Sequence, residues 1–364
     1  MKILQIIPQL GQGGAERFVI DLCNEMSKVH DVTLVVFYDG GDQSFFKEEL
    51  SDRVHFVVVP KRPGADMRLS FQIVKFIKRM KPDVVHTHLR AIVYTLLSGF
   101  VLHKVKFFHT VHSEAEKEAG GKIGKFSRKV AFRAKRFIPI TISEETMRSF
   151  ESLYNVRPEL IYNGRPGYHS SEKSQSVENE LHNLRTDATS KLIVNVARIE
   201  NAKNQVALAK AVEHLNQRGV AIDLCIIGNP MNQTVYEELK RMEAKHVHLL
   251  GVRMNPRDYM KAADAFCLSS IYEGMPITLI ECFSVGAIPL CTPVGGIRNM
   301  IQDGENGMLA KGVTQQDIED LLKRFYMTDT IALERMKEKS LSSFRHYDMQ
   351  TCANRYIRLF EQSR

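Results

Sequence analysis

Hydrophobic runs alternate with amphipathic stretches along the chain, an order typical of strands that are each followed by a helix. In the first part of the chain, apolar runs of strand length predict strands at 3–8, 32–37, 54–59, 83–86, 106–111 and 137–141, and helical spacing predicts helices at 15–28, 69–80 and 92–102. This alternation predicts a parallel sheet that is covered by helices on both faces.

The alternation stops and then restarts, which predicts two domains. Residues 166–190 are rich in Ser, Asn, His and Glu and are expected to be a linker or surface insertion. We expect a first α/β domain at 1–165 and a second at 191–345, where strands are predicted at 192–197, 223–228 and 248–251. A final helix is expected at 346–364, with an apolar stripe formed by Tyr356, Leu359 and Phe360.

Composition supports a globular protein with substantial cores. The chain has 364 residues, of which 44% are hydrophobic and 25% are charged. Its first residues indicate a buried strand and not a signal peptide, and its longest mostly apolar run, 91–102, is shorter than the ~20 residues that span a bilayer. The six cysteines are scattered without close pairs, which favours a reducing, cytoplasmic location and argues against structural zinc.

The charge is divided unevenly along the chain. Residues 1–165 hold 26 Lys and Arg against 18 Asp and Glu, whereas 166–364 hold 24 of each, so the whole excess of +8 lies in the first part. Within 122–137, basic residues interleave with Phe126, Val130, Phe132 and Phe137. A basic amphipathic helix suits an anionic membrane surface, although a solvated face over the core would give the same pattern. We expect no nucleic-acid partner, because no recognised binding motif is present.

The most informative motif is a pair of glutamates eight residues apart, Glu273 and Glu281. An apolar run at 264–269 precedes them, so Glu273 is expected at the carboxyl end of a buried strand, where ligands bind in open α/β sheets. Carboxylates accept hydrogen bonds from vicinal hydroxyl groups, so the pair suits polyols on either side of an anion. The alternative is that they are ordinary exposed glutamates of a strand-turn-helix unit.

The turn between the two glutamates is suited to a phosphate. Gly274, Met275 and Pro276 lead into a predicted helix, and proline suits the first helical position. The free N–H groups of Ile277 and Thr278, with the helix dipole behind them, would then face an anion.

A glycine-rich turn follows the first predicted strand. Gly13 and Gly14 would let the backbone approach an anion closely at the start of a helix. The sequence is neither a Walker loop nor a dinucleotide fingerprint, because Glu16 replaces the third glycine of the latter. A turn required only by chain geometry is the alternative.

Two cations follow the predicted strand at 192–197. Arg198 is expected at its end, and Lys203 is expected near the start of the next helix. They would neutralise a diphosphate and stabilise it as a leaving group, although lone basic residues at such positions are often simply solvated.

Histidines end two neighbouring predicted strands, at His86 and His88 and at His109 and His112. Paired histidines suggest a metal, but no third ligand stands out, and side chains at i and i+2 simply share a strand face. The sequence also lacks an Asp-x-Asp element that would hold a divalent ion beneath a sugar nucleotide. We therefore expect no metal and no cofactor.

The segment from Asp264 to Gly307 resembles the nucleotide-sugar-binding core of the retaining glycosyltransferases of family 4, group 1, which have two facing α/β domains (the GT-B fold). The resemblance includes the paired glutamates. It extends to Gly-Gly-Ala-Glu at 13–16, to His112 after Thr-Val, and to 195–204, where Ala197 replaces the usual glycine. The sequence departs from the family pattern at Ser113, where Asp is common, and at Arg165-Pro166.

This resemblance implies roles for individual residues. Glu281 would hold the ribose, Glu273 the sugar hydroxyls, and Arg198 and Lys203 the phosphates. Around the diphosphate and the base, the implied contacts come from Gly13, Gly14, Gly274, Met275, Pro276, Ile277, Thr278 and the backbone near Arg253. His112 would position and polarise the anomeric centre without acting as a nucleophile, and the last helix would cross back to the first domain.

The implied enzyme is a retaining, metal-independent glycosyltransferase. It would move a hexose or N-acetylhexosamine from a nucleotide-diphosphate sugar, a UDP-sugar by expectation, to a saccharide acceptor that is lipid-linked, in cell-surface polysaccharide or glycolipid synthesis. The protein would work in the cytoplasm, at the inner face of the membrane. A nucleotide-sugar epimerase and a non-catalytic nucleotide-sugar-binding protein remain alternatives, whereas a dehydrogenase would need the fingerprint that Glu16 breaks.

Overall fold

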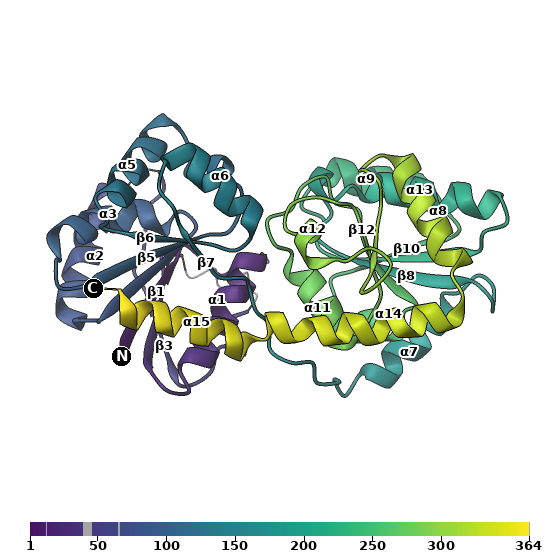
Figure 1. The fold of residues 1–364 in the computed structure, drawn as a ribbon, viewed down its shortest axis with the longest axis horizontal. Coiled ribbons are helices and arrows are strands. Elements are labelled where there is room, and N and C mark those ends of the chain that lie inside the picture. Colours follow the sequence, from purple (N-terminus) through teal and green to yellow (C-terminus); the bar gives the residue numbers. More distant parts are fainter. Residues whose placement is uncertain (12, 39–45, 65, 364) are drawn as a thin grey trace. The chain divides into compact units, whose positions relative to one another are not determined.

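The computed structural model describes residues 1–11, 13–38, 46–64 and 66–363, and the chain divides into two compact units. Unit 1 comprises Met1–Pro166 and Tyr347–Arg364, and unit 2 comprises Gly167–His346. Each is an α/β unit built on a parallel sheet (Figure 1). The predicted fold class, including the return of the last helix to the first unit, is therefore confirmed. Within the described ranges, no helix combines the length and the hydropathy that a membrane span requires.

In unit 1 the described strands form one sheet in the order β3-β2-β1-β4-β5-β6-β7, and every neighbouring pair is parallel. The elements of the unit are β1 Lys2–Ile7, α1 Gly14–Met26, β2 Asp31–Val36, η2 Lys47–Glu49, β3 Val54–Val58, α2 Met67–Met80, β4 Val84–His88, α3 Ala91–Val101, β5 Lys106–Val111, α4 Ala115–Ala119, α5 Lys122–Arg133, β6 Ile138–Thr141, α6 Glu144–Tyr154, β7 Glu159–Leu160 and α15 Met349–Gln362.

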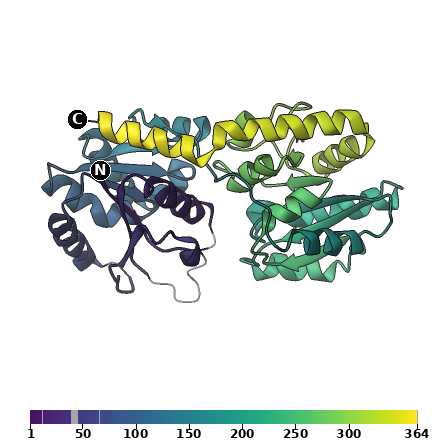
Figure 2. The ribbon, with the colours of Figure 1, turned by 90° about the horizontal axis from the view of Figure 1, so that it is seen from below.

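Two layers of helices cover this sheet. Helices α2, α3, α5 and α6 lie on one face, and α1 and α15 lie on the other (Figure 1). Helix α15 lies along unit 1 in both ribbon views (Figures 1 and 2). It inserts Tyr356 and Phe360, both fully buried, against His86 of β4 and Phe108 of β5. Two of the three residues predicted to form the apolar stripe of the last helix, Tyr356 and Phe360, therefore pack against the sheet of unit 1.

The segment that leaves unit 1 at Pro166 is hydrogen-bonded to the segment that re-enters it at Tyr347. Arg165, which departs from the family pattern, is buried and forms an ion pair with Asp21 of α1. Its backbone N–H donates to the carbonyl of Tyr347 (2.9 Å), and its carbonyl accepts from the N–H of Met349 (2.9 Å). Arg165 thus anchors the chain at the point where the two segments meet.

In unit 2 the described strands form one parallel sheet in the order β10-β9-β8-β11-β12-β13. The elements are α7 Ser174–Asn183, β8 Lys191–Val196, η3 Asn201–Lys203, α8 Gln205–Gln217, β9 Ile222–Ile227, α9 Gln233–Arg241, β10 Val247–Gly251, α10 Pro256–Ala262, β11 Ala265–Leu268, α11 Ile277–Val285, β12 Pro289–Cys291, α12 Ile297–Met300, β13 Met308–Leu309, α13 Gln315–Met327, α14 Thr330–Ser343 and η4 Phe344–Tyr347. The last of these crosses the unit boundary by one residue, near residue 346, where the final helix was expected to begin.

Helices α8, α9 and α13 cover one face of this sheet, and α7 and α11 lie on the other (Figure 1). Helix α10 packs against α7 and α11. Helix α7 lies within 166–190, the segment expected to be a linker or insertion. It buries Val177 and Leu181 and packs on α10, so this part of the chain belongs to the folded unit.

The packing of α15 gives a testable expectation. Phe360→Ala removes a fully buried ring that contacts His86, Phe108 and Tyr356. We expect it to lower the free energy of unfolding by ~3–5 kcal/mol in denaturant titrations. Arg358→Ala, an exposed position on the same helix, serves as the control and should change stability by less than about 0.5 kcal/mol. Equal effects of the two substitutions would show that α15 does not depend on this packing.

Candidate active site

The candidate site in unit 2 lies at the carboxyl ends of its strands. Because β8, β11 and β12 are parallel neighbours, the loops that follow them all emerge at the same end of the sheet, where the carboxyl ends of the strands lie. Two hydrogen bonds join the loops after β8 and β11: the N–H of Ile271 donates to the carbonyl of Ala202 (2.9 Å), and Ser269 Oγ donates to the carbonyl of Lys203 (2.8 Å).

These contacts bring two of the predicted residues together. Lys203 Nζ lies 2.7 Å from Glu273 Oε1, and the two side chains are only 16% and 9% exposed. Ser270 Oγ donates to the same carboxylate oxygen (2.6 Å). The pair therefore lies in a largely enclosed position, where a charge is retained only with such partners. Ser270 was not predicted, although its spacing of three residues before Glu273 is typical of a hydroxyl that reaches a nearby carboxylate.

The loop after β12 packs against the backbone around Glu273 and forms a hydrogen bond with it. The N–H of Gly296 donates to the carbonyl of Gly274 (2.7 Å). Gly295 has a φ of +54°, and a Cβ at this position would lie 1.9 Å from the carbonyl oxygen of Glu273. Only glycine permits both this conformation and this close approach. The glycine pair at 295–296 therefore shapes the loop that carries Glu273.

Helix α11 begins one residue later than the sequence predicted. Pro276 is the N-cap, with extended backbone, and Ile277 is the first helical residue. No side chain caps this end, and its first turn contains no acidic residue. The first N–H groups of a helix have no acceptor within the helix, so Ile277 and Thr278 present donors at the edge where Lys203 and Glu273 lie. Met275 is buried beneath the turn.

Glu281 lies in the second turn of α11 and is only 7% exposed. Together with the 9% exposure of the Glu273 side chain, this excludes the alternative of two ordinary solvated glutamates. Carboxylates are rarely enclosed in this way without a structural or binding role.

The other predicted cations differ from Lys203. Arg198 is 44% exposed and lies 3.0 Å from Glu200, while its carbonyl accepts a hydrogen bond from Gln205 Nε2 at the start of α8 (2.8 Å). The Arg253 guanidinium donates to Glu180 Oε1 of α7 (2.8 Å) and to the Tyr259 hydroxyl of α10 (2.8 Å). The hydrogen bond to Glu180 raises the pKa of Arg253 above its usual value. The Arg253 side chain therefore joins two helices, and only its backbone remains a candidate for ligand contact.

In unit 1 the candidate residues lie at the carboxyl ends of β1 and β5. Gly13 is the N-cap of α1 and adopts extended backbone (φ −112°, ψ 160°), which any residue can adopt. A Cβ at Gly13 would, however, lie 2.1 Å from the carboxylate of Glu16, so glycine makes room for that side chain. Gly14 is the first residue of α1.

His112 follows β5 and is held by groups from three sides. Its backbone N–H donates to the buried carboxylate of Glu118 (2.8 Å), and its ring meets the edge of Phe18 of α1 (centroids 5.7 Å apart). Its Nε2 lies 2.9 Å from Nδ1 of His88, whose Nε2 lies 2.9 Å from Gln5 Oε1. Neither His88 nor Gln5 was predicted as a partner of His112, because both are far from it in sequence.

The histidines contact other side chains of unit 1. His86 Nε2 contacts Thr110 Oγ1 (2.7 Å), and His109 lies between Thr87 and Glu118. Within the described part of the chain, no group of three or more His, Cys, Asp or Glu side chains is placed to hold a metal ion.

Burial keeps these histidines neutral. It lowers the pKa of His86 and His88 well below the usual value, lowers that of His109, and lowers that of His112 to about 4. The groups that act on His112 besides burial are Glu118, which raises its pKa, and His109, which lowers it. His112 is therefore an uncharged imidazole at neutral pH.

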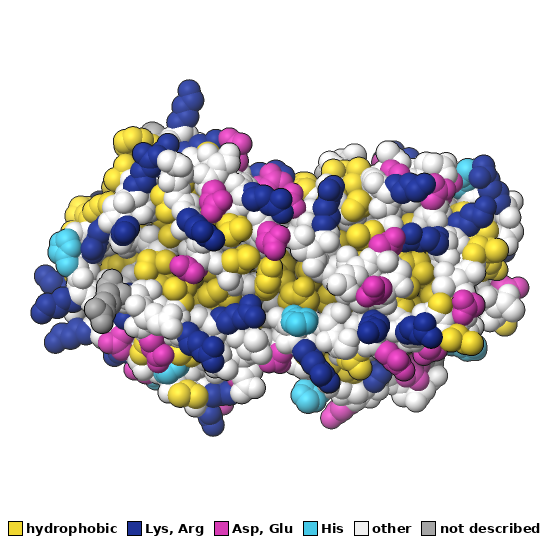
Figure 3. Space-filling model, in the orientation of Figure 1, with side chains coloured by type: hydrophobic (Ala, Val, Ile, Leu, Met, Phe, Trp, Pro, Cys, Tyr) yellow, Lys and Arg dark blue, Asp and Glu magenta, His cyan; other side chains and the backbone are white. Residues whose placement is uncertain are grey.

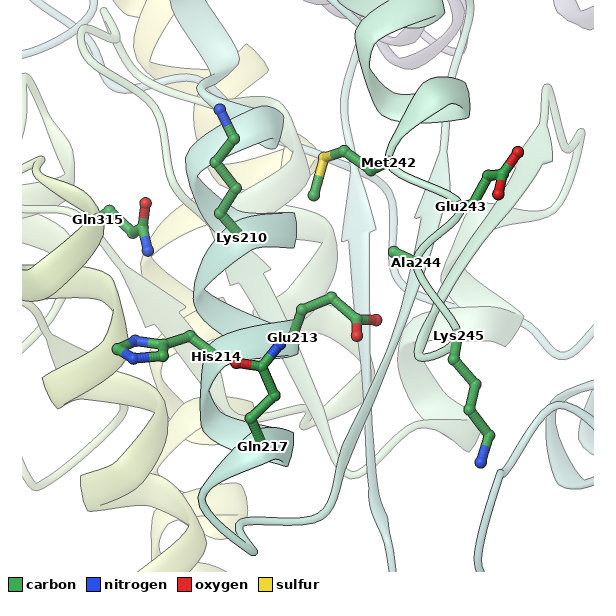
Figure 4. Close-up of a pocket in the computed structure, with 9 residues that line it drawn as sticks. All are labelled: Lys210, Glu213, His214, Gln217, Met242, Glu243, Ala244, Lys245 and Gln315. Atoms are coloured by element: carbon green, nitrogen blue, oxygen red, sulfur yellow. The ribbon is translucent and has the colours of Figure 1, made fainter.

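A cavity of about 560 Å³ in unit 2 lies away from the predicted residues (Figure 4). It is lined by the later turns of α8, including Lys210, Glu213 and His214, and by residues 242–245, which precede β10. These segments lie towards the amino ends of the strands, at the opposite edge of the sheet from Lys203 and Glu273. Its lining carries charges of both signs, and none of the residues predicted from the sequence is among the lining residues.

The two α/β units have the GT-B fold. HepE of Anabaena, solved in complex with UDP, is similar over the whole of both chains, with a TM-score of 0.83 and 18% identity. WaaG, a glycosyltransferase involved in lipopolysaccharide biosynthesis, is similar over 99% of this chain and 100% of its own, with a TM-score of 0.72 and 13% identity.

The chain belongs to glycosyltransferase family 4. The model described as "Glycosyltransferase Family 4" matches residues 12–166, and the model described as "Glycosyl transferases group 1" matches residues 176–342, so that together they span most of the chain.

Two curated relatives are similar over most of their length. A Campylobacter jejuni enzyme, an α-1,4-N-acetyl-D-galactosaminyltransferase named for a diphospho-undecaprenol-linked acceptor, is 26% identical over 85% of this chain and 84% of its own. An Escherichia coli enzyme, "UDP-Gal:alpha-D-GlcNAc-diphosphoundecaprenol alpha-1,3-galactosyltransferase", is 25% identical over 81% of this chain and 76% of its own.

The neutral histidines give a prediction about pH. In the unfolded chain they titrate near ~6.5, whereas in the folded chain they resist protonation. As the pH falls below ~6.5, the unfolded state binds protons that the folded state does not, so the free energy of unfolding decreases. For His112 this loss continues until the pH reaches its folded pKa of about 4.

His86→Gln isolates the contribution of one histidine, since the glutamine amide can replace the contact with Thr110. Between about pH 7 and about pH 5, we expect the variant to lose stability less steeply than the wild type, by up to one proton or about 1.4 kcal/mol per pH unit. Urea titrations over this range measure the slope. Parallel slopes for the two proteins would contradict the neutral state of His86.

Proposed function

We propose that this protein is a retaining, metal-independent glycosyltransferase that transfers a hexose or N-acetylhexosamine from a UDP-sugar to a lipid-linked saccharide. The reaction would serve cell-surface polysaccharide or glycolipid synthesis. The observation that carries the proposal is the enclosed Lys203–Glu273 pair, with Ser270, beside the uncapped start of α11.

The diphosphate is proposed to bind at the start of α11. The N–H groups of Ile277 and Thr278 and the helix dipole favour an anion there, and Lys203 supplies a cation in the same enclosed region. Arg198, which is more exposed, would meet the outer phosphate oxygens. These groups stabilise the charge that develops on the leaving phosphate, which removes the need for a divalent ion.

The two enclosed glutamates would bind the polyol parts of the substrate. Glu281 is proposed to accept hydrogen bonds from the ribose hydroxyls and Glu273 from the sugar hydroxyls. The backbone near Arg253, at the end of β10, would contact the base. In unit 1, His112, Gly13 and Gly14 would act on the reacting sugar and the acceptor, with His112 as a neutral group and not as a nucleophile.

Retention is proposed to follow from front-face attack. In this step the acceptor oxygen bonds to the anomeric carbon as the bond to the phosphate oxygen breaks, and the departing phosphate takes the acceptor's proton. The lipid-linked acceptor is supported by the Campylobacter jejuni and Escherichia coli relatives, whose names specify diphospho-undecaprenol-linked acceptors. UDP as the nucleotide is supported by the Escherichia coli relative's name and by the UDP complex of HepE.

The function is tested by measuring UDP release from a panel of UDP-hexoses and UDP-N-acetylhexosamines, with and without short-chain diphospholipid-linked saccharides. We expect release that depends on the acceptor. Conversion of the donor sugar without an acceptor would indicate an epimerase, and binding without turnover under every condition would indicate a non-catalytic protein.

Substitutions separate the roles of the two glutamates. Glu273→Ala should abolish transfer while UDP binding, measured by calorimetry, remains at least as tight, because Lys203 loses its carboxylate partner. Glu281→Gln should weaken UDP binding by about tenfold or more, as expected when hydrogen bonds to a charged group are lost. Glu305→Ala, at an exposed loop position, is the matched control and should change neither property. Unchanged turnover in Glu273→Ala would remove this residue from the site.

Contact with an anionic membrane surface is proposed for helix α5. Phe126 and Val130 are 70% and 42% exposed, and Lys122 and Arg133 are exposed on the same helix. Figure 3 shows hydrophobic side chains at the surface over α3 and α5, and Lys and Arg side chains at the left edge over α2 and α3. The exposed surface of 122–137 has fewer apolar and basic side chains than the sequence predicted. Phe132, Phe137 and Arg128 are buried, and Lys125 forms an ion pair with Glu116.

Vesicle flotation tests this contact. Vesicles that contain anionic lipid should bind the protein at low salt and release it as salt increases, because screening weakens the attraction. Phe126→Glu should reduce binding by about tenfold or more, since burial of a phenylalanine contributes ~1.5–3 kcal/mol. Ile331→Glu, at a 75% exposed position of unit 2, is the control. Absence of flotation at low salt, or equal loss in both variants, would contradict the proposal.

A further inference from the structure

A chain of buried hydrogen bonds ends at His112, and its first member is Gln5 of β1. Gln5 is fully buried, and both ends of its amide have a partner. Nε2 lies 3.6 Å from Met26 Sδ, and Oε1 lies 2.9 Å from Nε2 of His88. A thioether sulfur can only accept a hydrogen bond, so the amide NH2 group faces Met26 and the carbonyl oxygen faces His88.

The orientation of Gln5 determines which nitrogen of His88 carries hydrogen. A carbonyl oxygen only accepts, so Nε2 of His88 must be the donor. Burial lowers the pKa of His88 well below its usual value, so the ring is neutral and has a single N–H. Nδ1 of His88 is therefore an acceptor.

The same logic extends to His112. Its Nε2 lies 2.9 Å from the acceptor Nδ1 of His88 and must donate. The His112 ring is also neutral at pH 7, since burial lowers its pKa to about 4. Its one hydrogen is on Nε2, which leaves a lone pair on Nδ1. His112 is partly exposed whereas His88 is fully buried, so the chain of hydrogen bonds ends at a nitrogen nearer the surface.

We propose that Gln5 and His88 are positioning residues that fix His112 in its Nε2–H tautomer, so that Nδ1 accepts a hydrogen bond from a hydroxyl group of the reacting sugar. The identity of the hydroxyl-bearing ligand rests on the proposed function, whereas the tautomer does not. His112 then selects for a hydroxyl at one position of the sugar and orients it. The proton released by the acceptor remains with the departing phosphate.

The neighbours of His112 support this role. Glu118 holds the backbone N–H of His112 and not its ring, and Phe18 packs against the ring through an edge. The ring is therefore restrained on the side of Nε2 and by its backbone, and these contacts leave Nδ1 to the ligand. Of the partners described, His88 is the one that determines the tautomer.

The tautomer is measured directly by ¹⁵N–¹H correlation spectra of the full-length protein with ¹⁵N-labelled histidine, without ligand. We expect Nδ1 of His112 to resonate as an unprotonated nitrogen and Nε2 as a protonated one. A protonated Nδ1 in the wild type would overturn the proposal, whatever the enzyme's substrate.

Gln5→Glu provides a predicted reversal. A carboxylate beside Nε2 of His88 would stabilise the doubly protonated ring, whose Nδ1–H would donate to His112 and shift its hydrogen to Nδ1. We expect Nδ1 of His112 to resonate as a protonated nitrogen and Nε2 as an unprotonated one in this variant. The signals of His214 in unit 2 should not change. If His88 becomes doubly protonated and the His112 signals stay as in the wild type, His88 does not determine the tautomer of His112.

Met26→Leu tests the same chain of hydrogen bonds if the Gln5→Glu variant does not fold. This substitution nearly conserves the side-chain volume, so the variant is expected to fold. It removes the acceptor that orients the Gln5 amide, so we expect a mixture of His112 tautomers. A spectrum identical to that of the wild type would contradict the role of Gln5.

Turnover then tests the acceptor. With a UDP-sugar that the wild type uses, His112→Asn retains an oxygen near the position of Nδ1, whereas His112→Gln places its polar atoms near Nε2. We expect kcat of the Gln variant to fall about fivefold or more below that of the Asn variant, as for one lost hydrogen bond, with UDP binding unchanged in both. Equal losses would overturn the role of Nδ1. If the wild type uses no UDP-sugar, the proposed function fails, and the spectra still decide the tautomer.

Discussion

The parallel pairing of β8 with β11 is the constraint on which the candidate site depends. It places the carboxyl ends of the two strands, Val196 and Leu268, at the same end of the sheet, although they are 72 residues apart in sequence. The loops that follow are then joined by backbone and hydroxyl hydrogen bonds, and Lys203 comes within 2.7 Å of Glu273. Without the pairing of β8 with β11, Lys203 and Glu273 would not lie close enough to form an enclosed ion pair.

Stability alone does not explain this arrangement. An enclosed ion pair contributes little net stability, because the desolvation of both charges offsets their attraction. The loop that carries Glu273 also requires glycine at position 295, where φ is +54° and any side chain would meet the Glu273 carbonyl. A demanding backbone conformation that supports charged groups at a sheet edge is typical of a binding site and not of a core. Unit 1 shows the same character, since its enclosed polar groups form chains that end at His112.

Much of the fold follows from local patterns in the sequence. Most strands of the two sheets are visible as apolar runs, and the glutamates are visible as a motif. The two-residue strands β7 and β13 were not predicted. Other features depend on contacts that no local pattern contains. Gln5 and His88 lie 83 residues apart and meet only because β1 and β4 are neighbours. The paired histidines are visible in the sequence, whereas their partners depend on the order of the strands in the sheet.

Burial is the other property that the sequence could not supply. Phe132 and Phe137 resemble Phe126 as apolar residues in the same segment, yet they are buried whereas Phe126 is exposed. Packing against neighbouring elements decides which face of α5 is covered. The sequence predicted a backbone contact near Arg253, but it could not show that Glu180 and Tyr259 bind the Arg253 guanidinium. Residues 166–190 have the composition of a linker, and yet they contain a helix that buries Val177 and Leu181.

The most direct measurement is the location of UDP in a crystal of the complex. The diphosphate is expected at the N–H groups of Ile277 and Thr278 and beside Lys203, with the ribose at Glu281. UDP bound at the opposite edge of the sheet, in the cavity lined by Lys210 and Glu213, would contradict the assignment of the site.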